Sequence, residues 1–183
     1  VIAWQKRHGR HDLPWQNTRD LYRIWLSEIM LQQTQVATVI PYYARFLEKF
    51  PTLVDLARAS EDEVLALWSG LGYYSRGRNL LRAAHLAVEK FGGEFPREFD
   101  DILALPGIGQ STAAAISAFA FGERRAILDG NVKRVFARHF GIAGFYGEKK
   151  VEAKLWHVAN DALPKKNIEP YTQGLMDLGA TVC

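Results

Sequence analysis

The chain has 183 residues, of which 48% are hydrophobic and 23% are charged, so its composition excludes a disordered protein and allows one large domain or two small ones. No run of about 18 uncharged apolar residues is present, which excludes a membrane-spanning helix and favours a cytoplasmic protein with no membrane partner. A formal net charge of +3 and a pI of about 9.0 permit a polyanionic partner without selecting one, because each basic cluster is typical of a solvated helix face. The clusters are Arg76, Arg78 and Arg82; Lys133, Arg134 and Arg138; and Lys149 and Lys150.

Apolar residues recur with a period near 3.6 along most of the chain, and no segment alternates with period two, so the sequence predicts an all-α fold. In DLYRIWLSEIML, Glu28 takes a place that the spacing of Leu21, Ile24 and Trp25 reserves for an apolar residue. Further helices are expected at 36–50, 60–68, 80–91, 99–104, 111–121, 132–140, 151–163 and 171–182. No linker rich in Ser, Pro or charge separates them, which favours two packed helical halves over two tethered domains.

Two glycine corners, WSGLGYYSRGRN and ALPGIGQST, interrupt the helices. At the second corner, Pro106 ends one helix, and Gly107 and Gly109 permit positive φ and a close approach of another molecule. The next helix opens at Gln110 and Ser111, where free N–H groups and the positive end of the helix dipole can hold a phosphate. The alternative interpretation is a tight turn between two helices.

This corner, followed by ILDGNVKRV, resembles the hairpin and essential aspartate of the helix-hairpin-helix superfamily of DNA repair glycosylases. Within that superfamily, SEIMLQQTQVATVIPYY, LWSGLGYYSRGRNL, LPGIGQSTAAAI, ILDGNVKRV and MDLGATVC are similar to the catalytic domain of MutY-type adenine DNA glycosylases. The resemblance covers essentially the whole chain. It implies a monomeric base excision repair enzyme that removes adenine mispaired with 8-oxoguanine or guanine from double-stranded DNA, and that is nucleoid-associated if the source is bacterial.

The resemblance also implies two helical subdomains with the active site in the cleft between them. Residues 17–125 are expected to form a six-helix barrel that contains the helix-hairpin-helix at about 99–121. Residues 1–16 and 126–183 are expected to form the second subdomain, truncated at the first cysteine of an iron-sulfur cluster.

Cleavage of an N-glycosidic bond builds positive charge on the sugar, so it calls for one acid and one ionised carboxylate in unlike environments. Desolvation on an apolar stripe favours the protonated form of Glu28, although a Glu at the edge of the stripe would reach solvent. Asp129 precedes a helix, where capping N–H groups would keep it ionised. The resemblance makes Glu28 the acid that protonates adenine at N7. It makes Asp129 the electrostatic or covalent partner of the anomeric carbon of the sugar, and Asn131 the residue that orients Asp129. The alternative for Asp129 and Asn131 is simple capping.

Ser111 stands where superfamily members that also cut the DNA strand have a lysine that forms a Schiff base. The sequence therefore predicts a monofunctional glycosylase, which releases the base without cutting the strand.

By resemblance, Gln32, Gln33 and Thr34 fill the space left by the extruded adenine, and Tyr73 lies beside the oxidised guanine. The pattern alone would make the first three a polar helix end and Tyr73 a core aromatic residue. Two further groups are candidates: for the DNA backbone, Leu105, Gly107, Gly109, Gln110 and Ser111, and for the adenine pocket, with packing as the alternative, Trp15, Leu31 and Gln173.

Cys183 resembles the first of four cysteines that hold a [4Fe-4S] cluster in this family. Because cluster ligation needs four thiolates, the cluster is expected to be absent from this chain. A first residue other than Met and an abrupt end at LGATVC suggest a fragment that lacks a C-terminal domain for 8-oxoguanine recognition.

Two alternatives remain open. One is a related helix-hairpin-helix glycosylase that acts on mismatched thymine or on an oxidised pyrimidine. The other is a non-catalytic DNA-binding module, in which Glu28 and Asp129 would have no chemical role.

Overall fold

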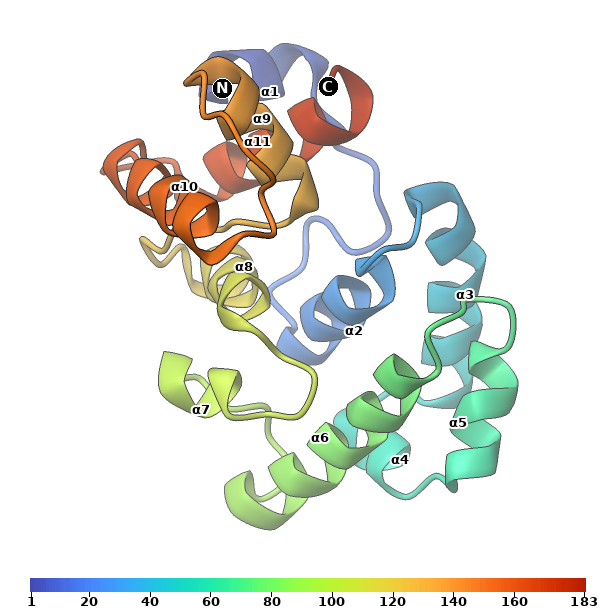
Figure 1. The fold of residues 1–183 in the computed structure, drawn as a ribbon. Coiled ribbons are helices and arrows are strands. Elements are labelled where there is room, and N and C mark those ends of the chain that lie inside the picture. The colour runs from blue at the N-terminus through green and yellow to red at the C-terminus, as the bar shows by residue number, and fades with distance from the viewer. The chain divides into compact units, whose positions relative to one another are not determined.

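The computed structural model describes residues 1–183, and it contains helices but no strand, which confirms the all-α prediction (Figure 1). None of the helices combines the length and the apolar character needed to cross a bilayer. The elements are α1 Ile2–His8, α2 Leu21–Leu31, α3 Val36–Lys49, α4 Leu53–Ala57, α5 Glu61–Trp68, α6 Ser75–Phe91, α7 Phe99–Leu103, α8 Gln110–Phe121, α9 Gly130–His139, α10 Lys149–Asp161 and α11 Ile168–Thr181.

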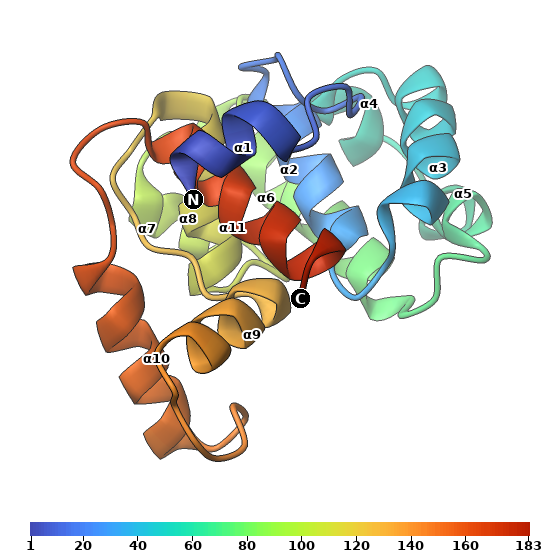
Figure 2. The same ribbon diagram turned by 90° about the horizontal axis from the view of Figure 1, so that it is seen from above.

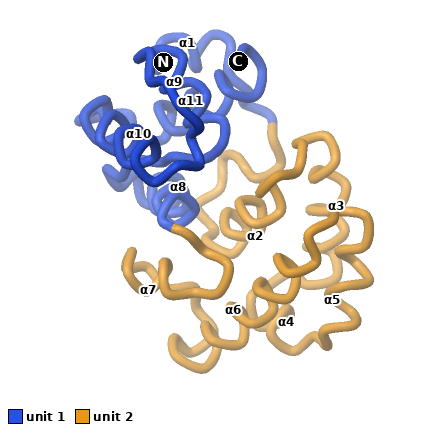
Figure 3. The backbone as a smooth tube through the Cα atoms, in the orientation of Figure 1, with its two compact units in different colours: residues 1–12, 110–183 blue, residues 13–109 orange.

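The chain divides into two compact units (Figure 3). Unit 1 comprises residues 1–12 and 110–183 and contains α1 and α8 to α11, whereas unit 2 comprises residues 13–109 and contains α2 to α7. The unit boundaries, after residues 12 and 109, differ from the expected subdomain boundaries after residues 16 and 125. The main difference is α8, which packs against α11 and so belongs to unit 1.

In unit 2, α2 is buried on nearly every side. Asp20 caps its N-terminus by accepting hydrogen bonds from the backbone N–H groups of Tyr22 and Arg23. From residue 24 to residue 30, every side chain is buried except that of Glu28, which is partly exposed. A helix that is apolar all round lies inside a domain, so Glu28 is the one ionisable group in a desolvated stretch. The helix packs against α3 and α6.

In unit 1, α11 is the central helix and packs against α1, α8 and α9 (Figures 1 and 2). Two glycines of α11 permit close approach. A Cβ on Gly174 would lie 2.9 Å from Gln5 Cβ in α1, and a Cβ on Gly179 would lie 2.7 Å from the Cα and carbonyl O of Asn131 in α9. Backbone therefore packs against backbone next to the Asp129 segment, where a larger side chain has no room.

All nine predicted helices are present, whereas the short helices α1 and α4 were not predicted. Thr52 and Asp55 form a capping box at α4, a local signal that could have revealed it. Several helices begin before their predicted starts, and α6 begins at residue 75 rather than 80. Their first turns carry polar residues, Gly or Pro, which do not contribute to an apolar period.

Candidate active site

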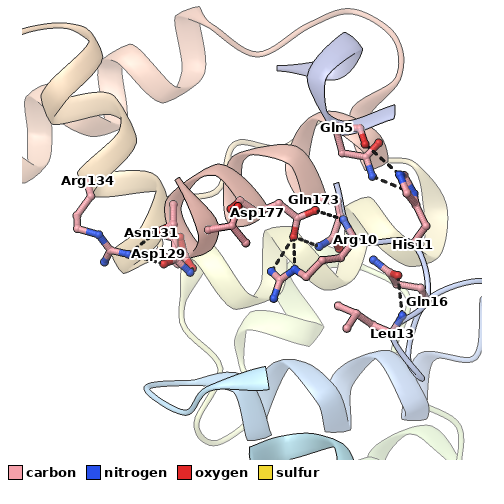
Figure 4. Close-up of polar contacts among 12 residues, drawn as sticks. Gln5, Arg10, His11, Leu13, Gln16, Asp129, Asn131, Arg134, Gln173 and Asp177 are labelled. Atoms are coloured by element: carbon pink, nitrogen blue, oxygen red, sulfur yellow. Dashed lines mark hydrogen bonds and ion pairs between the residues drawn. The ribbon is translucent and has the colours of Figure 1, made fainter. Parts of the chain in front are cut away.

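Asp129 is the N-cap of α9, as the sequence predicted (Figure 4). Its Oδ1 accepts a 2.8 Å hydrogen bond from the backbone N–H of Val132, and its Oδ2 accepts a 3.3 Å hydrogen bond from Nδ2 of Asn131. Just before it, the backbone N–H of Leu128 donates to Oγ of Ser111, at 2.9 Å. The carboxylate is therefore fixed by a cap, a side-chain amide and an anchored preceding residue.

Burial raises the pKa of the Asp129 carboxyl above its ordinary value. The hydrogen bonds from Val132 and Asn131 and the positive charge of Arg134 act in the opposite direction and stabilise the anion. The expectation that capping N–H groups would keep the carboxyl ionised leaves out this burial, whose effect on the pKa outweighs theirs. The carboxylate is thus poorly solvated and held by directed donors.

Arg134 extends this arrangement to α11 (Figure 4). One nitrogen, Nη2, donates to Oδ1 of Asn131 and to the carbonyl of Gly179, both at 2.7 Å, while Nη1 donates to the carbonyl of Gly130 at 3.0 Å. The amide of Asn131 is thereby oriented: its oxygen accepts from Arg134, and its NH2 group faces Asp129. The expectation that the basic cluster around Arg134 is a solvated helix face is wrong for this residue.

Glu28 lies in unit 2 on α2, partly exposed between the buried side chains of Ser27 and Ile29. Ser27 donates its hydroxyl back to the carbonyl of Ile24 at 2.8 Å, so this polar neighbour is satisfied within the helix. The sequence placed Glu28 on a desolvated stripe, and the structure gives it a buried helix with one partly open position.

The segment after α2 carries Gln32, Gln33 and Thr34. Gln33 has φ of 55°, in the left-handed region, and is exposed. Gln32 donates through Nε2 to the carbonyl of Gly107 at 3.4 Å, which connects this segment to the glycine corner of the hairpin. These residues form an ordered turn rather than a frayed helix end.

Tyr73 has φ of 48° and is 58% exposed, so it projects from its loop. The expectation of a core aromatic residue, drawn from the pattern alone, is wrong. An exposed ring on a strained backbone is suited to stacking against a base.

The hairpin corner is confirmed only in part. Gly107 has φ of 82° and lies against Asn79, where a Cβ would come within 2.9 Å of the Asn79 Cβ. Gly109 has open space around it and does not adopt the positive φ that a glycine permits. Gln110 is exposed at the start of α8, but Leu105 is only 2% exposed, so its side chain belongs to the core rather than to a DNA-binding surface.

Two of the three pocket candidates have packing or structural partners. Trp15 is buried with its ring 5.4 Å from that of Tyr43, and Leu31 is partly exposed at the end of α2. Gln173 donates through Nε2 to Asp177 at 2.9 Å. Asp177 is fully buried and also accepts from the backbone N–H and Nε of Arg10, at 3.0 and 2.7 Å (Figure 4).

Cys183 is exposed, and Arg138 donates to its carbonyl at 2.6 Å. A single thiol does not fit a [4Fe-4S] cluster, which requires four, so no step of the chemistry is assigned to the cluster here. No group of three or more His, Cys, Asp or Glu side chains comes together as a metal site.

The chain resembles DNA glycosylases in sequence along its whole length. A sequence profile described as HhH-GPD superfamily base excision DNA repair protein matches residues 26–161. An adenine DNA glycosylase of Buchnera aphidicola subsp. Acyrthosiphon pisum (strain APS) is 46% identical over 183 residues, covering 100% of this chain and 52% of that protein. The adenine DNA glycosylase of Homo sapiens is 44% identical over 192 residues, covering 100% of this chain and 35% of that protein. The chain thus spans about half or less of the length of these relatives.

Solved structures agree on the fold. A thermostable thymine-DNA glycosylase has a TM-score of 0.87 at 31% identity, covering 98% of this chain and 82% of that one. An endonuclease III trapped in a covalent intermediate with DNA has a TM-score of 0.79 at 22% identity, covering 97% and 80%. At that identity the second likeness concerns the fold alone.

Proposed function

Because the chain belongs to the HhH-GPD superfamily of base excision DNA repair proteins, we propose that it is the catalytic part of an adenine DNA glycosylase. Its substrate is then double-stranded DNA in which adenine is mispaired with 8-oxoguanine or guanine. The observation that carries the proposal is the 46% identity to an adenine DNA glycosylase over all 183 residues. The capped, oriented carboxylate of Asp129 supports it.

In the proposed reaction, the adenine is first extruded from the duplex, because chemistry at its glycosidic bond is blocked within the base stack. Glu28 donates a proton to the adenine ring at N7. The protonated base then takes the electron pair of the breaking C1′–N9 bond and leaves as neutral adenine. Asp129 stabilises the positive charge on the sugar, and Asn131 and Arg134 hold Asp129 in place. Water adds to C1′ and loses a proton, which gives an abasic site and free adenine.

The proposal includes no strand cleavage. A lyase step requires an amine that attacks C1′ and forms a Schiff base, and Ser111 supplies a hydroxyl instead. That hydroxyl accepts from the backbone N–H of Leu128, so its role is to anchor the segment that leads to Asp129.

A base-release assay with three duplexes tests the function. The duplexes contain adenine opposite 8-oxoguanine, thymine opposite guanine, or thymine glycol, and each is incubated in excess protein. Free adenine from the first duplex alone, with no strand break before alkali, is the expected result. Release of a pyrimidine without release of adenine would reject the adenine assignment.

A second candidate is a glycosylase for mismatched thymine. It is favoured by the thymine-DNA glycosylase structure, which matches 98% of this chain at 31% identity. The higher identity to adenine glycosylases makes it the weaker candidate, and the thymine-guanine duplex decides between them.

Removing the amide of Asn131 should move the acid limb of the pH–rate profile. Asp129 acts as an anion, so the excision rate falls as pH decreases through its pKa. That pKa is already raised by burial, and the Asn131 hydrogen bond partly opposes the rise. In Asn131→Ala the limb should therefore lie at higher pH than in the parent.

Single-turnover rates across pH measure this effect, with Asn160→Ala as the control because Asn160 is an exposed residue of α10. An unmoved limb with a uniformly lower rate would show that Asn131 only positions Asp129.

A further inference from the structure

Arg76 is a buried arginine between two of the segments assigned above to DNA contact. We propose that it is a positioning residue that couples the turn at Gln32 to Thr34 with the loop that carries Tyr73. Through this coupling, insertion of Tyr73 beside the opposite base and extrusion of adenine become one concerted event. The inference rests on the proposed function, because that function gives the two segments their roles.

Arg76 is only 8% exposed, and every hydrogen-bond partner of its guanidinium belongs to unit 2. Its Nη1 donates to one segment alone, whereas its Nη2 donates to both. The partners of Nη1 are the carbonyls of Ile29 (3.0 Å), Met30 (2.9 Å) and Gln32 (2.5 Å); those of Nη2 are Thr34 Oγ1 (3.0 Å) and the carbonyls of Leu71 (3.1 Å) and Gly72 (3.2 Å).

These partners surround the two strained residues of the segments. Gln33, with φ of 55°, stands between two partners of Arg76, and Tyr73, with φ of 48°, directly follows a third. A left-handed conformation at a residue other than Gly persists only where its surroundings enforce it. One side chain therefore enforces both strained turns at once, so a change in one turn alters the hydrogen bonds that fix the other.

Arginine suits this role better than lysine. Its planar group holds the Nη1 and Nη2 donors in a fixed arrangement and stays charged when buried, whereas an ammonium has three donors on one atom. Nε is buried and has no partner. Cζ of Arg76 also lies 5.5 Å from the centre of the Tyr73 ring and 5.4 Å from that of Trp68, within the range of cation–π attraction. The Arg76 clamp, meaning the guanidinium and its hydrogen-bond partners in the two segments, thus contacts the Tyr73 side chain as well as its loop.

The expectation that Arg76 belongs to a basic, solvated helix face is wrong. The spacing of Arg76, Leu80, Ala83 and Ala87 places it on the apolar stripe of α6, a signal that could have revealed its burial.

Hydrogen exchange of the free protein tests the clamp without reference to activity. The variant is Arg76→Lys, and Arg82→Lys is the matched control because Arg82 is exposed on the same helix. Two backbone amides report on the two segments: Thr34 N–H, bonded to Leu31, and Leu71 N–H, bonded to Trp68. We expect both to exchange at least about tenfold faster in Arg76→Lys alone, because charged hydrogen bonds are lost. Acceleration at one segment or at neither overturns the coupling.

A double-mutant cycle then tests the consequence in single-turnover excision. In the parent, the combined loss from Gln33→Ala and Tyr73→Ala should differ from the product of the single losses by about fivefold or more. In the Arg76→Lys background the two losses should multiply. Non-additivity that persists without Arg76, or that is absent from the parent, overturns the proposal.

Two outcomes need separate treatment. If the parent excises no adenine, the proposed function fails, while hydrogen exchange still reports on the clamp. If Arg76→Lys does not fold, Thr34→Val replaces it in both measurements, because it removes one partner of Nη2 and keeps the shape of the side chain.

Discussion

Asp129→Asn should lower the single-turnover rate of adenine release by about 10²- to 10³-fold or more, because the sugar cation loses its anionic partner. The fold should survive the change. Asparagine is as good an N-cap as aspartate, so the hydrogen bond from the backbone N–H of Val132 can be kept. The loss should therefore appear in chemistry while the melting temperature and the affinity for mispaired DNA stay near the parental values.

The matched control is Asp20→Asn. Asp20 is also an N-cap, accepting from the N–H groups of Tyr22 and Arg23 at 2.9 and 3.3 Å, but it is exposed and no step of the reaction uses it. Excision by Asp20→Asn should equal that of the parent. If Asp129→Asn bound the mispair and still released adenine at the parental rate, the assignment of Asp129 as the cation stabiliser would be wrong.

The features that the sequence predicted correctly are local. The cap at Asp129 and the positive φ at Gly107 each depend on residues within about one helical turn. A period in apolar residues located nine helices for the same reason, since it records which face of each helix is buried. The short helices α1 and α4 were not predicted, although α7, with five residues, was.

The features that the sequence did not predict depend on partners far along the chain. Arg134 bonds to Gly179, separated by 45 positions, and Arg76 bonds to Gln32, separated by 44. Nothing near Arg134 in the sequence distinguishes it from the solvated bases of the same helix, and only its place on the apolar stripe of α6 distinguishes Arg76. The raised pKa of Asp129 was missed likewise, because burial depends on tertiary packing.

Gly179→Ala should stabilise α11 locally through helix propensity but destabilise the fold by more through overpacking against α9. Helix propensity alone would stabilise α11 by about 1 kcal/mol, since alanine is the better helix former. The added Cβ, however, would overlap the Cβ of Asn131 and lie 2.7 Å from its Cα and carbonyl O. Backbone atoms cannot rotate away as a flexible side chain does, so α9 and α11 must separate.

We therefore expect Gly179→Ala to lower the free energy of unfolding by about 1–3 kcal/mol, the usual cost of overpacking. It should also slow excision by about a hundredfold, because a displacement of the reacting groups by about 1 Å has that effect. Asn131 moves with the strained contact, and its hydrogen bond to Asp129 moves with it. Chemical denaturation and single-turnover excision measure the two losses.

Ala180→Ser is the comparison, since it adds one heavy atom at the next, exposed position of the same helix. It should leave stability within about 0.5 kcal/mol of the parent. A Gly179→Ala protein that is more stable than the parent would mean that propensity outweighs the contact, and that α11 does not press on Asn131. A protein that is destabilised but fully active would mean that Asp129 keeps its geometry without Asn131, which would remove Asn131 from the proposed mechanism.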